Sequence, residues 1–215
     1  MQTVIAGGHG KIALILTEIL SSRGGRVRSL IRNPDHASDI RNAGGDPVVL
    51  DLESATDDAI ETALLDCDAI VFAAGAGPGS SAERKETVDH QGAVRLMDAA
   101  NRVGPRRYVI VSSTGADPDH EGDEIFDVYL RAKGKADRDL AASGLDFTII
   151  RPVGLTDAPG SRRISVGEEV AEPTIPRDDV AGVISEVLER DDMVGKTFRL
   201  SSGEDLVSEA LDQLA

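Results

Sequence analysis

The 215-residue sequence lacks tryptophan and is poor in aromatic residues, with two tyrosines and four phenylalanines. It has a single cysteine, Cys67, so no disulfide can form within the chain. This cysteine lies in the apolar stretch LLDCDAIVFAA, which favours a packed thiol over a reactive one. We therefore assign Cys67 no chemistry.

Long hydrophobic runs are also absent. The longest apolar stretches have only the length of a β-strand, which argues against a membrane-spanning helix. The N-terminus does not show the basic, hydrophobic and small-residue pattern of a signal peptide. We expect a cytoplasmic protein that does not bind membranes.

Positive charge is scarce in this acidic protein. The 38 Asp and Glu residues outnumber the 23 Lys and Arg residues, and the formal net charge is -15. Such a surface repels phosphate backbones and anionic lipids, so we expect a small-molecule substrate rather than nucleic acid or a membrane. The acidity is equally compatible with a salt-adapted host and with a mesophile that has a GC-rich genome. The sequence does not choose between a monomer and a homodimer.

What the chain does contain is a regular alternation of strand and helix patterns. Apolar runs of strand length occupy residues 2–6, 26–31, 46–52, 68–74, 106–113 and 146–152, and segments with helical spacing separate them. This order indicates parallel βαβ units with both faces of the sheet covered. We expect one doubly wound α/β domain over residues 1–215. Because the pattern is shorter and less regular after Pro152, residues 152–215 are expected to form a small C-terminal extension on the substrate side.

A glycine-rich turn joins the first strand to the first helix. In VIAGGHGKIA, the glycines are Gly7, Gly8 and Gly10. Backbone without side chains can approach a pyrophosphate, and the free amides and dipole of the following helix face its negative charge. The position after the first strand of a βαβ series indicates a dinucleotide site. His9 in the same turn is either a phosphate contact or a plain loop residue.

The end of the second strand bears on the choice of coenzyme. Enzymes that prefer NAD usually carry an acidic residue there, whereas this chain has Arg32. A guanidinium can grip a 2′-phosphate with two hydrogen bonds, and Lys11 would add a second positive charge. The pattern predicts NADP (NADPH), with NAD as a weaker alternative; the other interpretation is that both cations are solvated surface residues. Asp51 after the third strand would accept a hydrogen bond from the adenine amino group or cap the strand end.

The stretch VYLRAK places Tyr129 four residues before Lys133. This spacing puts both side chains on one face of a helix. A phenol with a reference pKa of about 10 is a poor base near neutrality, and a neighbouring cation favours the phenolate. The pair is either a catalytic acid/base with its activator or two side chains that share a helix face.

Together these motifs resemble the short-chain dehydrogenase/reductase superfamily, and especially its atypical branch of small NAD(P)-binding proteins related to NAD-dependent epimerases and dehydratases. They follow the family's order over most of the chain: the glycine turn, Arg32, Asp51, FAAGAG, VSSTG, Tyr129 with Lys133, RPVGL and IPRDDVA. The resemblance implies a Rossmann-type fold. The region after Pro152 is shorter than in enzymes that act on nucleotide sugars, which argues against such a substrate.

The resemblance also implies roles for matching residues. Tyr129 would be the general acid or base, Lys133 would hold the nicotinamide ribose, and Ser113 or its neighbour Thr114 would hydrogen-bond the reacting oxygen. The hydroxyls of VSSTG could instead cap a helix. The candidate cofactor-binding residues are Gly7, Gly8, His9, Gly10, Lys11, Ile12, Arg32, Asp51, Leu52, Ala73, Ala74, Gly75, Ser112, Lys133, Pro152 and Val153.

The expected function is that of an NADP(H)-dependent oxidoreductase or epimerase/dehydratase-like enzyme, which transfers hydride to or from a small carbonyl or hydroxyl substrate. The alternative is a non-catalytic NADP(H)-binding redox sensor. The four histidines lack metal-ligand spacing, so no metal is expected.

Overall fold

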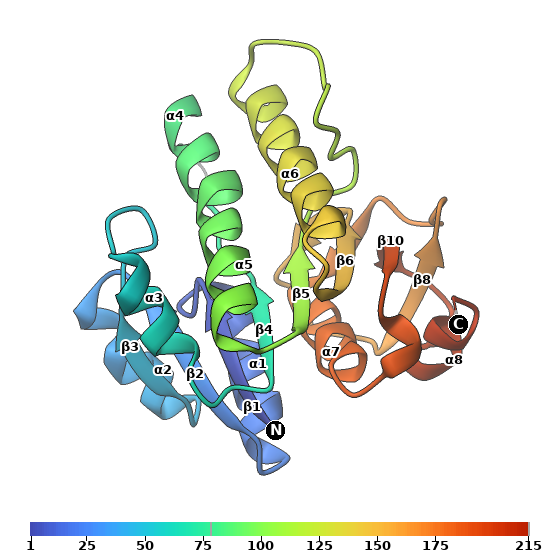
Figure 1. Cartoon of the computed structure of the whole chain (residues 1–215). Coiled ribbons are helices and arrows are strands. Elements are labelled where there is room, and N and C mark those ends of the chain that lie inside the picture. Colours follow the sequence, from blue (N-terminus) through green and yellow to red (C-terminus); the bar gives the residue numbers. More distant parts are fainter. Residues whose placement is uncertain (78, 215) are drawn as a thin grey trace.

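The computed structural model describes residues 1–77 and 79–214 and places helices on both faces of a nine-stranded sheet (Figure 1). The strands of this sheet are β1 (Gln2–Ala6), β2 (Arg26–Ile31), β3 (Asp46–Val49), β4 (Ala69–Phe72), β5 (Arg107–Val111), β6 (Asp146–Pro152), β8 (Arg163–Gly167), β10 (Lys196–Ser202) and β11 (Asp205–Leu206). A separate small sheet pairs β7 (Gly154–Thr156) with β9 (Thr174–Pro176).

The helices follow the strands in the expected alternation. They are α1 (Lys11–Ser22), α2 (Ala37–Asn42), α3 (Asp57–Leu64), α4 (Ala82–Arg84), α5 (Gly92–Val103), α6 (Ile125–Ala142), α7 (Arg177–Val187) and α8 (Val207–Asp212). Short 3₁₀ turns are η1 (Pro34–His36) and η3 (Asp191–Met193), and a π-helical segment, η2 (Lys85–Gln91), joins α4 to α5.

The strand order is β11-β8-β10-β6-β5-β4-β1-β2-β3. All neighbours from β3 to β10 are parallel, and β8 and β11 close one edge in antiparallel fashion. The predicted doubly wound Rossmann-type fold is therefore confirmed. The chain reverses its direction of travel across the sheet between β1 and β4, and ligands in such folds bind beyond the carboxyl ends of the strands at this point.

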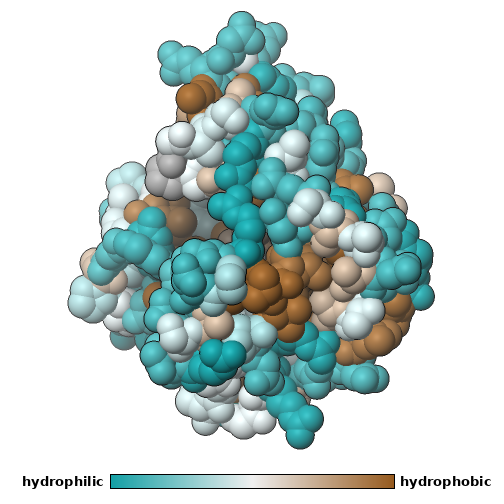
Figure 2. Space-filling view, turned by 90° about the vertical axis from the view of Figure 1, so that its left-hand side faces the viewer, coloured by the Kyte–Doolittle hydropathy of each residue, from teal (hydrophilic) through white to brown (hydrophobic). Residues whose placement is uncertain are grey.

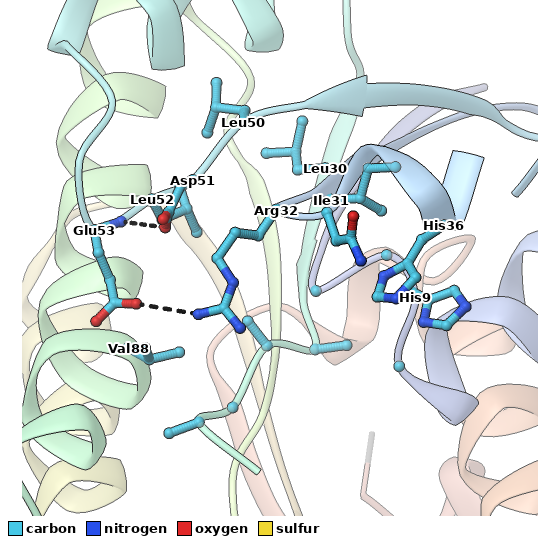
Figure 3. Close-up of a pocket in the computed structure, with 18 of the residues that line it drawn as sticks. His9, Leu30, Ile31, Arg32, His36, Leu50, Asp51, Leu52, Glu53 and Val88 are labelled. Carbon is cyan, nitrogen blue, oxygen red and sulfur yellow. Dashed lines mark hydrogen bonds and ion pairs between the residues drawn. The ribbon is translucent and has the colours of Figure 1, made fainter. Parts of the chain in front are cut away.

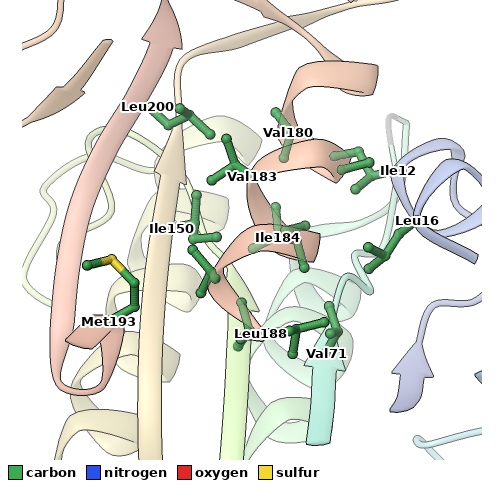
Figure 4. Close-up of a cluster of buried hydrophobic side chains, with 14 of the residues drawn as sticks. Ile12, Leu16, Val71, Ile150, Val180, Val183, Ile184, Leu188, Met193 and Leu200 are labelled. Atoms are coloured by element: carbon green, nitrogen blue, oxygen red, sulfur yellow. The ribbon is translucent and has the colours of Figure 1, made fainter. Parts of the chain in front are cut away.

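Successive side chains along each strand point to opposite faces of the sheet, so two cores form, one on each face. On β1, Val4 belongs to the core that includes residues of α3, α5 and α6, while Ile5 belongs to the core that includes residues of α1, α7 and α8. Figure 4 shows the second core, in which Ile12 and Leu16 of α1 meet Val180 and Ile184 of α7. The segment after Pro152 thus completes the main sheet and one of its cores.

Three predicted elements differ in detail from the structure. The strand expected over residues 46–52 ends at Val49, because the chain turns at Asp51, whose carboxylate accepts a hydrogen bond from the Glu53 amide at 3.0 Å. The helix expected over residues 83–103 is continuous but contains η2. The strand expected over residues 106–113 ends at Val111.

The surface is mainly hydrophilic, as expected from the many charged residues in the sequence. Hydrophilic residues cover most of the face seen in Figure 2, and hydrophobic ones gather in a patch near its centre. Among residues 1–77 and 79–214, no helix combines the length and the apolar character needed to cross a membrane. Burial raises the pKa of the Cys67 thiol to about 11, so the thiol stays protonated near neutrality.

Two helical glycines provide a test of this packing. A Cβ at Gly134 of α6 would lie 2.1 Å from the carbonyl carbon of Asp117, whereas one at Gly182 of α7 would meet only Arg162 Cδ at 4.0 Å. We expect Gly134→Ala to lower the free energy of unfolding by about 1–3 kcal/mol through overpacking. Gly182→Ala should instead raise it by up to about 1 kcal/mol. Urea unfolding measures both, and a stabilised Gly134→Ala variant would contradict the close approach.

Candidate active site

The glycine turn fits tightly against two neighbouring segments. Gly7 has a φ of +77°, and a Cβ there would lie 2.5 Å from the Cα of Ala74. A Cβ at Gly8 would lie 2.5 Å from the Cβ of Ser29. Positions 7 and 8 therefore have no room for a side chain, and the turn leads directly into the N-terminus of the 12-residue helix α1, where an anion is favoured.

A first cavity of about 280 Å³ lies beyond the ends of β1 to β4 (Figure 3). Its wall contains many of the predicted cofactor-binding residues: Gly7, Gly8, His9, Gly10, Arg32, Asp51, Leu52, Ala73, Ala74 and Gly75. It also contains His36, whose ring stacks on that of His9 with centroids 3.6 Å apart. The His9 ring nitrogen lies 2.8 Å from Asp39.

Two arginines share one carboxylate in this cavity. Glu53 Oε2 lies 3.6 Å from Arg32 and 2.6 Å from Arg84, and Thr87 donates a hydrogen bond to Oε1 at 2.6 Å. Although burial acts to raise it, the hydrogen bonds from Thr87 and Arg84 hold the pKa of Glu53 below its usual value. The sequence prediction did not include Glu53 or Arg84. The fold brings Arg84 of α4 to Glu53, which follows β3.

Lys11 does not join Arg32. Its ammonium lies 2.5 Å from Asp157, which also pairs with Arg177 at 2.6 Å. In this structure the side chain turns toward the acidic partner in the C-terminal segment, and the expected contact of Lys11 with a 2′-phosphate stays a prediction. Arg84 provides the second cation instead.

A second cavity of about 540 Å³ adjoins the first, since Ala73, Ala74 and Gly75 line both. Tyr129, Lys133, Ile12 and Ser112 from the sequence prediction lie in its wall. The remaining lining residues are Gly77, Gly79, Lys85, Asp89, Val111, Ile125, Phe126 and Leu155. Leu155 is the contribution of the C-terminal segment within the described part of the chain.

Lys133 is held firmly within the fold, with 3% of its side chain exposed. Its ammonium donates hydrogen bonds to the carbonyl oxygens of Ala74 at 3.2 Å and Val111 at 3.1 Å, and it lies 3.4 Å from Asp89. Tyr129 is partly exposed on the same face of α6, as the spacing predicts. Tyr129 therefore remains accessible while its lysine neighbour is fixed.

Asp89 and Lys85 are site residues that the sequence prediction missed. Asp89 is fully buried and accepts a hydrogen bond from the amide of Ala76 at 3.0 Å. Its other oxygen has no hydrogen-bond partner among the described residues and lies 3.4 Å from Lys133. Both residues belong to η2, and π-helical turns often occur at functional sites. Their only signal in the sequence is a Lys and an Asp four residues apart, which is usually typical of a solvated helix face.

The hydroxyl residues after β5 lie differently from the prediction. Ser112 lines the second cavity, and its hydroxyl donates to the buried carboxylate of Asp137 at 2.8 Å. Ser113 and Thr114 do not line the cavity; their hydroxyls donate to the carbonyls of Thr114 and Arg151. Burial raises the pKa of Asp137, against the opposing effects of Arg151 and the Ser112 hydrogen bond.

Pro152 and Val153 lie outside both cavity walls. The Pro152 carbonyl accepts a hydrogen bond from the Thr114 amide at 2.9 Å, and the Val153 amide donates to Leu200 at 3.0 Å. Both residues thus join β6 to its neighbours. Within residues 1–77 and 79–214, no group of three or more His, Cys, Asp or Glu side chains could hold a metal ion.

The chain is similar to known NAD(P)H-binding proteins over most of its length. A family model described as NAD(P)H-binding matches residues 7–191. A Bacillus subtilis protein named "uncharacterized sugar epimerase" is 32% identical over 215 residues, which is 100% of both chains. Sanguinarine reductase from Eschscholzia californica is 37% identical over 133 residues, which is 58% of this chain and 49% of that protein.

Solved structures agree with this match. A Bacillus halodurans protein provisionally named an NAD-dependent epimerase/dehydratase superimposes with a TM-score of 0.90 and 34% identity, covering 99% of both chains. The oxidoreductase ylbE from Lactococcus lactis gives a TM-score of 0.86 with 28% identity, covering 100% of this chain and 96% of the other.

The buried ion pair of Asp89 and Lys133 provides a second test. We expect Asp89→Asn to lower the free energy of unfolding by about 3–5 kcal/mol, because it leaves a buried ammonium without a counter-charge. Adding Lys133→Met should recover much of that loss, and a double-mutant cycle measured by urea unfolding gives the coupling. Asp98→Asn on the exposed face of α5 is the matched control and should change little. Additive losses in the cycle would contradict the pairing.

Proposed function

Because the chain belongs to the NAD(P)H-binding family, we propose that it is an NADP(H)-dependent oxidoreductase that acts on a small carbonyl or hydroxyl compound, with Tyr129 as its general acid or base. The family contains oxidoreductase-like and epimerase-like proteins, and the resemblance to the atypical short-chain dehydrogenase/reductase branch is confirmed. One observation carries the proposal. The cavity with the arginines and the cavity with Tyr129 and Lys133 share a wall, so one dinucleotide can extend through both.

The residues of the first cavity suit the phosphate-bearing half of the coenzyme. The first amides of α1 have no acceptor within the helix and can approach the diphosphate, whereas the amides of Gly8 and Gly10 already donate to the carbonyls of Leu30 and Gly7. Arg32 and Arg84 would bind the 2′-phosphate, since two guanidiniums around one carboxylate already form a site for an anion. Glu53 would have to give up its contact with at least one of the two arginines when the phosphate binds. Asp51 and Leu52 would line the adenine side.

The residues of the second cavity suit proton transfer. When bound, the coenzyme supplies or accepts the hydride. Tyr129 would donate a proton to the reacting oxygen, or accept one from it in the reverse direction. Lys133 would hold a ribose hydroxyl, and Asp89 with the two carbonyls keeps its ammonium in place. Ser112 rather than Ser113 offers a hydroxyl in the cavity wall, in contact with Asp137.

The reductase relative and the apolar cavity support a reductase over an epimerase. Sanguinarine reductase matches 58% of this chain, and its name describes a reduction. Exposed Ile125 and Phe126 form an apolar side of the second cavity. Apolar walls suit a carbonyl compound better than a sugar rich in hydroxyl groups.

A redox sensor is a second candidate that one observation favours. Ser113, which the family pattern assigns to the reacting oxygen, has its hydroxyl turned to the Thr114 carbonyl outside the cavity wall. A protein that only binds NADP(H) does not need this hydroxyl. The turnover experiment below separates the two functions.

Removing either arginine tests the coenzyme preference. We expect Arg32→Ala and Arg84→Ala each to weaken NADPH binding by about 10-fold or more, because each loses a hydrogen bond to a charged phosphate. NADH binding should change little, since NADH has no 2′-phosphate. Arg41→Ala on the exposed side of α2 is the control. Calorimetry with both coenzymes measures the effect, and equal losses for NADPH and NADH would remove the assigned role.

Turnover tests the role of Tyr129. We expect Tyr129→Phe to lower kcat by about 100-fold or more, the range for a lost general acid, while NADPH affinity stays unchanged. Tyr108→Phe is the matched control, because this second tyrosine is buried and its hydroxyl donates to the Ala93 carbonyl. NADPH oxidation is followed with a panel of quinones, aldehydes and ketones. If the wild type binds NADPH but oxidises it with no member of the panel, the sensor is the better account.

A further inference from the structure

Lys85 is a buried cation in the second cavity that the proposed proton transfer does not use. It is 7% exposed, and its ammonium donates a hydrogen bond to the Gly77 carbonyl at 2.8 Å. The same ammonium lies 5.4 Å from the centre of the Tyr129 ring. Lys85 therefore lies beside the proposed acid, separate from Lys133.

The charge around Lys85 is not balanced within the described residues. No carboxylate there lies within ion-pair distance of its ammonium, and the nearby Asp89 pairs with Lys133. Two ammonium groups and one carboxylate thus line the same cavity. A buried ammonium is costly without an opposite charge, and a carbonyl and an aromatic ring compensate it only in part. This local positive charge occurs in a chain with a formal net charge of -15.

Part of the wall of this cavity is apolar. Ile125, Phe126 and Leu155 line it with 52%, 62% and 36% of their surfaces exposed. Large apolar side chains left exposed at a cavity are typical of ligand contacts. The volume of about 540 Å³ would hold the nicotinamide end of the coenzyme together with a small substrate.

We propose that the substrate is a flat, mainly apolar molecule that carries an acidic group such as a carboxylate, and that Lys85 binds this group. The inference rests on the proposed function, since it takes the second cavity as the substrate site. The apolar side would hold the ring system, and Lys85 would pair with the anion. Tyr129 then stays free to serve the reacting oxygen.

Two fluorescent probes test this pairing on the full chain with saturating NADP⁺. One is 8-anilinonaphthalene-1-sulfonate, an apolar aryl sulfonate, and the other is N-phenyl-1-naphthylamine, which has the same ring skeleton without the sulfonate. The wild type should bind the sulfonate at least about 10-fold more tightly, as expected for one desolvated ion pair. Lys85→Met should lower only the sulfonate affinity, by a similar factor. Lys85→Arg should retain it, and Lys196→Met, at the start of β10, should have no effect.

Equal affinity of the wild type for the two probes would overturn the proposal. So would a Lys85→Met variant that loses affinity for both probes by the same factor. A weaker NADP⁺ affinity in that variant would also overturn it, because Lys85 would then belong to the coenzyme site. The wild-type ratio does not depend on whether Lys85→Met folds. Phe126→Ala, at an exposed position, should weaken both probes alike. Failure of the proposed function appears separately, as absent NADP⁺ binding in wild-type calorimetry, which uses neither probe.

Discussion

The site depends on the burial of one lysine. The ammonium of Lys133 is almost fully removed from water, so the fold must surround it with a counter-charge and hydrogen-bond acceptors. Asp89 on η2 supplies the charge, and the carbonyls of Ala74 and Val111 supply the acceptors. These contacts tie α6 and η2 to the carboxyl ends of β4 and β5. The cavity that holds Tyr129 is bounded by the same elements, so its shape follows from this ion pair.

Much of the fold could be predicted because its signals are local or periodic. The strand and helix patterns indicate parallel βαβ units, and a glycine turn after the first strand identifies the phosphate end. The order of the central strands then brings their carboxyl ends to one edge. Gly7, Arg32 and Asp51, which are far apart in the sequence, consequently line the first cavity. Tyr129 and Lys133 share a helix face as their spacing predicts, and both line the second.

The remaining site residues could not be predicted because their roles depend on tertiary contacts. Lys11 has a long flexible side chain, and its partner Asp157 lies 146 residues away in the sequence. Lys85 and Asp89 are charged residues within a helical pattern, which normally indicates a solvated face; their burial requires the wider turn of η2 and the approach of α6. Glu53 lies just beyond a strand that ends earlier than expected. In each case the sequence gives the residue type but not the residue that it contacts in the fold.

The central claim is that a single NADP(H) molecule extends through both cavities, from the arginine pair to Tyr129. A crystal structure of the chain with NADP⁺ tests it most directly. The account predicts the 2′-phosphate between Arg32 and Arg84, the diphosphate on the glycine turn, and the nicotinamide ring beside the hydroxyl of Tyr129. A coenzyme confined to one cavity, or a nicotinamide ring distant from that hydroxyl, would contradict it.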